Sequence, residues 1–142
     1  MNIFSIYPEE SSEKAISNYT KQLIKGQKSQ GVYVSSLTYT AGDYSTLKLD
    51  DIKERDVVHI QHEYNLFGKF GLPFFHLYQT LGKKKVRVIT TMHNVLSKKQ
   101  KFEGNPIKTI LRKQLYKYQN EILEKNSDII IVRRILQEDF GE

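Results

Sequence analysis

Titratable and hydrogen-bonding side chains gather at two places in this sequence, and each place follows a short apolar run. The first group comes after the run at residues 57–60 and consists of Gln61, His62, Glu63 and Tyr64. The second comes after the run at residues 86–91 and includes His93 and Asn94. Histidine suits a general base or a hydrogen-bonding group for a substrate hydroxyl, because its ordinary pKa is about 6.5. The first group and His93 are therefore site candidates, and we favour a functional role for His93.

Each candidate also has an ordinary structural interpretation. His93 could be satisfied by a loop carbonyl, and His62 and Glu63 could form an exposed loop pair instead of orienting a hydroxylated ligand or each other. His59 lies inside the first run and is expected to be a buried histidine hydrogen-bonded between layers, while His76 is expected at the surface. A metal site built from these residues is not expected, since their spacing matches no short zinc signature and His59 and His62 point to opposite faces of a strand.

The elements that must position these side chains alternate between strand and helix. Strands are expected at residues 2–7, 32–37, 57–60, 86–91 and 129–132, and helices from Ser11 or Ser12 to before Gly31, up to Gly82, at 106–126 and at 133–140. This order predicts a single α/β domain over residues 1–142, with a doubly wound, mostly parallel Rossmann-like sheet flanked by helices. Because the carboxyl ends of parallel strands share one edge, His62, Glu63 and His93 should converge there.

Three of the expected helices carry an apolar stripe. The stripe of the first helix consists of Ile16, Tyr19, Leu23 and Ile24. The stripe of the second consists of Phe74, Leu77, Tyr78 and Leu81, and that of the third consists of Ile107, Ile110, Leu111, Leu115, Tyr118 and Ile122. In the third helix, four basic residues sit largely off the stripe: Lys108, Arg112, Lys113 and Lys117. We expect this stripe to cover the sheet and the basic face to be solvated; the alternative is peripheral contact with anionic lipid.

Composition narrows the classes of partner and location. The chain has 142 residues, a net charge of +6 and no cysteine, so disulfides and thiolate chemistry are excluded. The basic clusters at residues 83–85 and 98–101 should lie at opposite edges of the sheet, which argues against a nucleic-acid groove. A nucleotide-binding glycine signature, a P-loop and a Gly-x-Ser-x-Gly motif are all absent. The start does not resemble a signal peptide, and we expect a cytoplasmic protein.

Three segments resemble motifs of the retaining GT-B glycosyltransferases of family 4. They are residues 56–64, residues 88–95 and residues 127–132, the last resembling the strand before the crossover to the family's second domain. The resemblance spans nearly the whole chain but only the N-terminal, acceptor-side half of the family's enzyme. It implies that His93 is the active-site histidine and that the substrate-binding residues are Gln61, His62, Glu63, Tyr64 and Asn94. It also implies a sugar or lipid-linked acceptor, and no cofactor or obligatory metal.

Two departures from the family pattern shape the expected function. The half that binds the nucleotide-sugar lies outside this sequence, so a separate donor-binding chain is an expected partner. The Gly-Gly loop that usually follows the first strand is replaced by residues 8–14, where Glu9, Glu10 and Glu13 would repel donor phosphates. We therefore expect an acceptor-side domain that is incomplete alone, in the cytoplasm or at the inner membrane face. The alternative is a non-catalytic module that binds an anionic metabolite or a partner protein.

Overall fold

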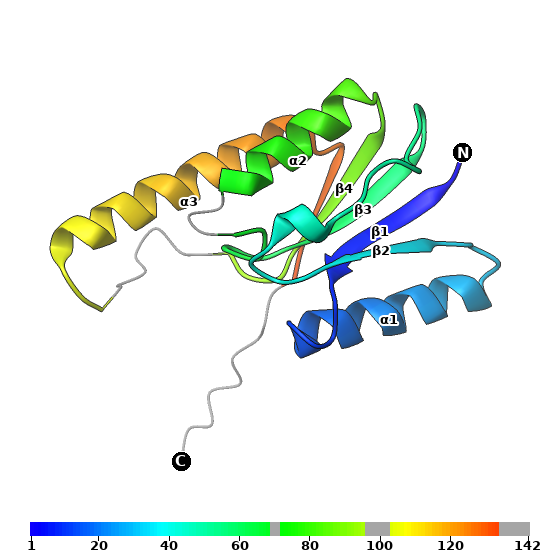
Figure 1. Cartoon of the computed structure of the whole chain (residues 1–142), viewed down its shortest axis with the longest axis horizontal. Coiled ribbons are helices and arrows are strands. Elements are labelled where there is room, and N and C mark those ends of the chain that lie inside the picture. Colours follow the sequence, from blue (N-terminus) through cyan, green and yellow to red (C-terminus); the bar gives the residue numbers. More distant parts are fainter. Residues whose placement is uncertain (69–71, 96–102, 134–142) are drawn as a thin grey trace, which may run out of the picture.

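Five parallel strands form one sheet in the order β2-β1-β3-β4-β5. The computed structural model describes residues 1–68, 72–95 and 103–133 (Figure 1). The strands are β1 (Ile3–Pro8), β2 (Ser35–Tyr39), β3 (Val57–His62), β4 (Arg87–Met92) and β5 (Ile129–Val132). The helices are α1 (Lys14–Ser29), α2 (Leu72–Lys83) and α3 (Pro106–Asn126), with a short 3-10 turn, η1, at Tyr44–Thr46.

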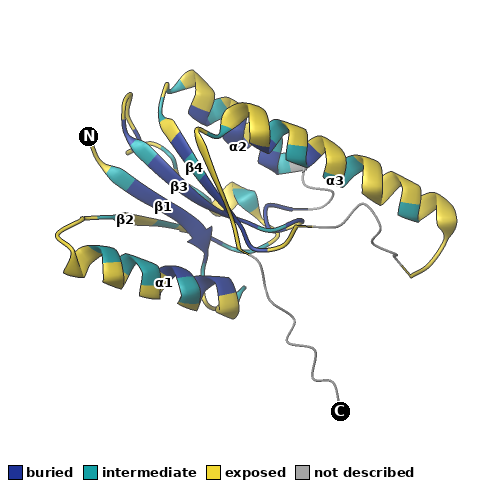
Figure 2. Cartoon of the chain, turned by 180° about the vertical axis from the view of Figure 1, so that it is seen from behind, coloured by how far each residue is buried: buried dark blue, intermediate teal, exposed yellow. Residues whose placement is uncertain are grey.

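Helices cover both faces of the sheet, which confirms the predicted doubly wound α/β architecture. In Figures 1 and 2, α1 lies on one face, and α2 and α3 lie side by side on the other. The helix expected at 133–140, apart from Arg133, and the basic cluster at 98–101 lie outside the described residues. Among the helices that are described, none combines the length and the apolar character needed to cross a bilayer.

The amino-terminal cap of α1 and the start of β2 differ from the expected ones, for physical reasons, whereas α1 ends before Gly31 as predicted. The N-cap is Glu13, not Ser11 or Ser12, because the Glu13 carboxylate accepts the free N–H groups of the first turn. At the other end, the N–H groups of Gly31 and Val32 donate to carbonyls of the last turn, and Gly31 has a φ of 79°. This Schellman motif ties Val32 to the helix, so β2 begins at Ser35 instead of at residue 32.

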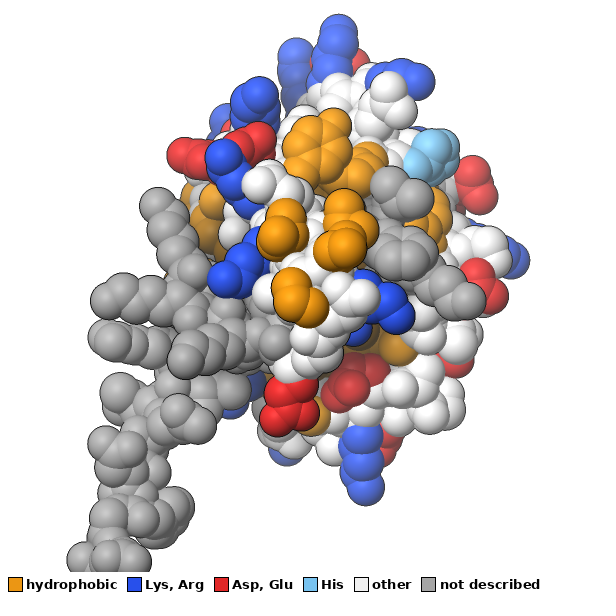
Figure 3. Space-filling model, turned by 90° about the vertical axis from the view of Figure 1, so that its left-hand side faces the viewer, with side chains coloured by type: hydrophobic (Ala, Val, Ile, Leu, Met, Phe, Trp, Pro, Cys, Tyr) orange, Lys and Arg blue, Asp and Glu red, His pale blue; other side chains and the backbone are white. Residues whose placement is uncertain are grey.

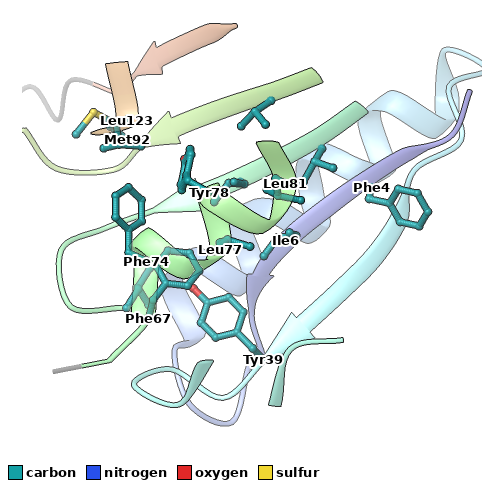
Figure 4. Close-up of a cluster of buried hydrophobic side chains, with 14 of the residues drawn as sticks. Phe4, Ile6, Tyr39, Phe67, Phe74, Leu77, Tyr78, Leu81, Met92 and Leu123 are labelled. Carbon is teal, nitrogen blue, oxygen red and sulfur yellow. The ribbon is translucent and has the colours of Figure 1, made fainter. Parts of the chain in front are cut away.

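The main apolar core lies between the sheet and the pair formed by α2 and α3. The predicted stripe of α2 is confirmed, since its four members are all fully buried (Figure 4). They pack on alternate residues of the strands, and the strand residues of this layer include Phe4, Ile6, Val58, Ile60, Val88 and Met92. The residues between them in sequence point to the α1 face, where the buried side chains include the polar residues Ser5, His59, Gln61 and Thr91.

The predicted stripe of α3 is wrong over most of its length. The amino-terminal half of this helix extends beyond the end of α2, as Figures 1 and 2 both show. The inward positions are Gln119 and Leu123, which are 0% exposed, whereas Ile107 is 67% exposed and Leu111 is 63% exposed. Sequence periodicity identified residues that share one face of the helix, but the sheet packs on a different face near the carboxyl end.

Candidate functional site

A ladder of polar side chains lies in the layer between the sheet and α1. The register places Gln61 of β3 beside Thr91 of β4, and His59 lies one step earlier on the same face. His59 Nε2 lies 2.7 Å from Thr91 Oγ1 and 3.3 Å from Gln61 Nε2, and His93 Nε2 lies 2.8 Å from Gln61 Oε1. All four side chains are buried. The prediction that His59 is a buried, hydrogen-bonded histidine is confirmed.

The direction of these hydrogen bonds follows from the amide of Gln61. Its N–H group can only donate, so His59 Nε2 is the acceptor in that contact, and the Thr91 hydroxyl lies beside the same nitrogen. Its oxygen can only accept, so the N–H at Nε2 of His93 donates to it. In a neutral His93 the lone pair therefore sits on Nδ1, which makes Nδ1 the ring atom able to accept a hydrogen bond.

Both histidines of the ladder are held neutral at physiological pH. Burial lowers the pKa of His59. Burial also lowers the pKa of His93 to about 4, with smaller contributions from the positive charge of Arg133 and from His59, and Glu13 opposes them. Neutral rings preserve the hydrogen-bond directions described above.

Two residues near His93 were missed as site residues by sequence reasoning. The ring of Tyr19, from α1, meets the His93 ring edge to face at a centroid distance of 5.1 Å. The guanidinium carbon of Arg133 lies 4.6 Å from the centroid of the Tyr19 ring, a cation–π contact. A signal for Arg133 was present: it directly follows β5, just as Glu63 follows β3 and His93 follows β4. The strand-end rule applied to the fifth strand would have included it.

A second polar pair lies at the same edge. Asn94 Nδ2 donates to Glu63 Oε1 over 2.5 Å, joining the segments that follow β3 and β4. The backbone N–H of His93 donates to the carbonyl of His62 over 3.0 Å, which continues the strand pairing by one step. Glu63 and His93 therefore converge at the carboxyl edge, as predicted.

His62 and Tyr64 do not join this group. His62 is 1% exposed on the opposite face of the sheet, where its ring lies 4.8 Å from that of Phe74 and 6.0 Å from that of Phe67. Neither ring nitrogen has a hydrogen-bond partner among the described residues. Burial lowers the pKa of His62 to about 3, with a smaller effect from His93. The expectations of an exposed loop pair, and of Glu63 orienting His62, are both wrong, because β3 carries His62 into the aromatic layer.

Tyr64 serves to attach the segment after β3 to α3. Its hydroxyl donates to Asn120 Oδ1 over 2.8 Å, and its ring lies 4.4 Å from that of Tyr116. The residues that follow it, Leu66 and Phe67, are buried in the core. The described part of the segment after Tyr64 is therefore largely core structure.

The acidic turn before α1 is engaged in internal contacts. The carboxylate of Glu13 accepts from the N–H groups of Ala15 and Ile16 at 3.0 and 3.3 Å. Glu10 pairs with Lys21, and Glu9 accepts a hydrogen bond from the Thr40 hydroxyl. The helix N–H groups that bind phosphate in dinucleotide-binding folds are thus occupied by a carboxylate of the chain itself.

Two negative results complete the description of the site. Over residues 1–68, 72–95 and 103–133, no group of three or more histidine, aspartate or glutamate side chains is placed to hold a metal ion. As predicted, His59 and His62 point to opposite faces of β3, so they cannot act as a pair. A scan against models of known protein families and a search of curated proteins each give no match to this chain.

Proposed function

We propose that this chain is a glycosyltransferase-like acceptor-side domain, which holds a hydroxyl of a sugar or lipid-linked acceptor at the carboxyl edge of its sheet. The observation that carries the proposal is the state of His93: a neutral imidazole at that edge, fixed by Gln61, with its lone pair on Nδ1. The resemblance of residues 56–64 and 88–95 to family 4 motifs supports the same assignment.

The role we assign to His93 is to accept a hydrogen bond from a hydroxyl and so orient it. A pKa of about 4 keeps the ring in its basic form at neutral pH. The same pKa makes it a weak proton acceptor, because general bases work best when their pKa is near the working pH. Glu63 and Asn94 extend the polar edge and offer further hydrogen bonds to the hydroxyls of a sugar ring. Tyr19 lies against the histidine, in the manner of an aromatic wall for a sugar.

The donor would come from elsewhere. In related folds a nucleotide phosphate binds at the N-terminus of the first helix, but Glu13 occupies those N–H groups here. A phosphate in that place would also meet the repulsion of a second negative charge. We therefore propose that the nucleotide-sugar is bound by a separate donor-binding chain and that this domain alone does not transfer sugar.

A second candidate is a non-catalytic module that binds an anionic metabolite. The observation in its favour is Arg133, an exposed cation that lies over Tyr19 at the same edge. On this alternative an anion would bind at Arg133, and no hydroxyl would need to reach His93.

A titration followed by NMR distinguishes the two candidates. Sugars such as glucose, mannose and N-acetylglucosamine should shift the signals of the His93 ring and of the Asn94 amide. His93→Asn should weaken binding by about tenfold, the value of one hydrogen bond to a buried group, and the surface variant His76→Asn should not. If inorganic phosphate shifts the signals of Arg133 and no sugar shifts any signal, the result would favour the anion-binding module. Robust sugar transfer by the lone chain would overturn the need for a donor-binding partner.

A further inference from the structure

The outer face of α3 carries a row of apolar side chains that are each more than half exposed. We define the α3 stripe as Ile107, Ile110, Leu111 and Tyr118, which are 67%, 60%, 63% and 54% exposed. They occupy positions i, i+3, i+4 and i+11 of one helix and so lie along one line. Figure 3 shows apolar side chains gathered on this end of the molecule, with Lys and Arg side chains around them. A contiguous exposed apolar patch marks an interaction site more often than a scattered residue does.

Basic residues border the α3 stripe on both sides. At about 100° per residue, Lys108 and Arg112 fall on one flank and Lys113 and Lys117 on the other. All four are exposed, and no acidic residue occurs in α3 before Glu121. The surface is therefore apolar along its centre and positive along both margins.

The stripe is held in a fixed orientation by the rest of the fold. The ring of Tyr118 lies 4.8 Å from the ring of Phe75 in α2. Further along the helix, Leu123 is fully buried against the core. The stripe therefore faces outward on a rigid support.

We propose that the α3 stripe lies on the surface of an anionic lipid bilayer. An interfacial helix inserts its apolar side among the lipid chains, and its lysines and arginines reach the headgroups on either side. Tyrosine at one end of the stripe suits the boundary between lipid and water. Anionic lipid complements the two positive flanks, and each basic residue near such a surface adds about 1 kcal/mol of attraction, or about a fivefold gain in binding.

A second copy of the chain fits this surface less well. Two α3 stripes facing each other would bring the basic flanks of both helices together, and like charges in contact oppose association. This inference does not depend on the glycosyltransferase proposal, since it concerns a different face of the molecule and is measured without any sugar.

The test is co-sedimentation of the full chain with lipid vesicles. The chain should bind vesicles of equal parts phosphatidylcholine and phosphatidylglycerol, and bind pure phosphatidylcholine vesicles much more weakly. Lys108→Gln with Lys113→Gln should lower the partition coefficient about 25-fold, at about fivefold per charge. The control Lys25→Gln with Lys28→Gln removes the same charge from α1 and should change it less than about twofold.

A second pair of variants tests the apolar part. Ile110→Ser with Leu111→Ser should reduce partition by at least about tenfold, because two large apolar side chains no longer enter the lipid. Val32→Ser with Tyr33→Ser removes exposed apolar residues elsewhere and should have little effect. Circular dichroism verifies that each variant is folded. Equal binding to neutral and anionic vesicles, or equal losses in the α3 and control variants, would overturn the proposal. So would self-association in sedimentation velocity that Ile110→Ser with Leu111→Ser abolishes.

Discussion

His93 Nε2 lies 2.8 Å from Gln61 Oε1, and this contact joins the ends of two neighbouring strands inside the polar layer under α1. Gln61 also donates to His59, so one amide fixes the hydrogen-bonding state of two imidazoles. The chemistry available at the carboxyl edge therefore depends on a residue that is itself 0% exposed.

Replacing this amide should disturb both rings. Gln61→Met keeps the length of the side chain but leaves the N–H of His93 without its acceptor. We expect the free energy of unfolding in urea to fall by about 1–3 kcal/mol, the cost of a buried polar group left unpaired. Nitrogen-15 NMR should show the Nε2–H tautomer of His93 in the wild type and a mixture of tautomers in the variant. Gln79→Met, an exposed substitution in α2, is the control. A wild-type ring protonated at Nδ1 would contradict the hydrogen-bond directions described here.

His62 should make the protein sensitive to acid. Its pKa is about 3 when folded and returns to about 6.5 on unfolding. The unfolded state therefore binds more protons between these values, and the free energy of unfolding must fall as the pH drops from about 6.5 toward about 3. His93, with a pKa of about 4, adds a loss of the same sign over part of this range.

His62→Leu should remove its share of that loss. The substitution also eliminates two buried nitrogens that have no hydrogen-bond partner in the described part of the chain, so stability at neutral pH should rise by about 1–3 kcal/mol. Urea unfolding of both proteins at pH 7 and pH 5 checks both effects. The gap between the two proteins should widen at pH 5. A constant gap would mean that the His62 ring is not responsible for the pH dependence.

Two leucines of α3 should respond in opposite ways to truncation. Leu123 is 0% exposed, and Leu123→Ala should cost about 2–5 kcal/mol through lost burial and a cavity. Leu111 is 63% exposed, and Leu111→Ala should change stability by less than about 0.5 kcal/mol. Thermal or urea unfolding of the two variants measures the difference. Comparable losses at both positions would show that the amino-terminal half of α3 packs against the core.

Two glycines offer a matched test of backbone conformation. Gly68 has a φ of 132°, and a Cβ there would lie 2.9 Å from Pro73 Cγ, so Gly68→Ala should destabilise the fold by more than about 1 kcal/mol. Gly26 lies within α1 with open space around it, and Gly26→Ala should stabilise by about 0.5–1 kcal/mol. Urea midpoints compare the two. A stabilising Gly68→Ala would mean that the turn after β3 is built differently.

Much of this architecture was predictable from the sequence, because strand and helix periodicities are local properties. Over the described residues, the order of the elements and the buried face of α2 are confirmed, and so are the positions of Glu63 and His93 at one edge. Which helix covers which strand face is not local. Gln61 and His62 are neighbours in β3, so their side chains point to opposite faces of the sheet. Because helices cover both faces, the sequence pattern could not show which of the two would contact His93.

The α3 error has a different origin. Periodicity groups residues onto one side of a helix, yet only the packing of neighbouring elements decides whether that side is covered. The apolar pattern therefore showed correctly that Ile110 and Leu111 share one face of the helix, but it predicted wrongly that this face is buried. The N-cap of α1 was also predicted wrongly, because glutamate is a less usual N-cap residue than the serines that precede Glu13.

The alternation of polar and apolar residues along β3 also disfavours a shifted register between this strand and its neighbours. A shift of one residue would turn His59 and Gln61 toward the phenylalanine-rich layer and Val58 and Ile60 toward the polar one. The polar side chains of β3 would then be buried in the apolar layer without hydrogen-bond partners, and its apolar side chains would lie in the polar layer. The hydrogen-bonded polar residues that fix the tautomer of His93 thus also destabilise sheets with a shifted register. They therefore favour a single strand register during folding.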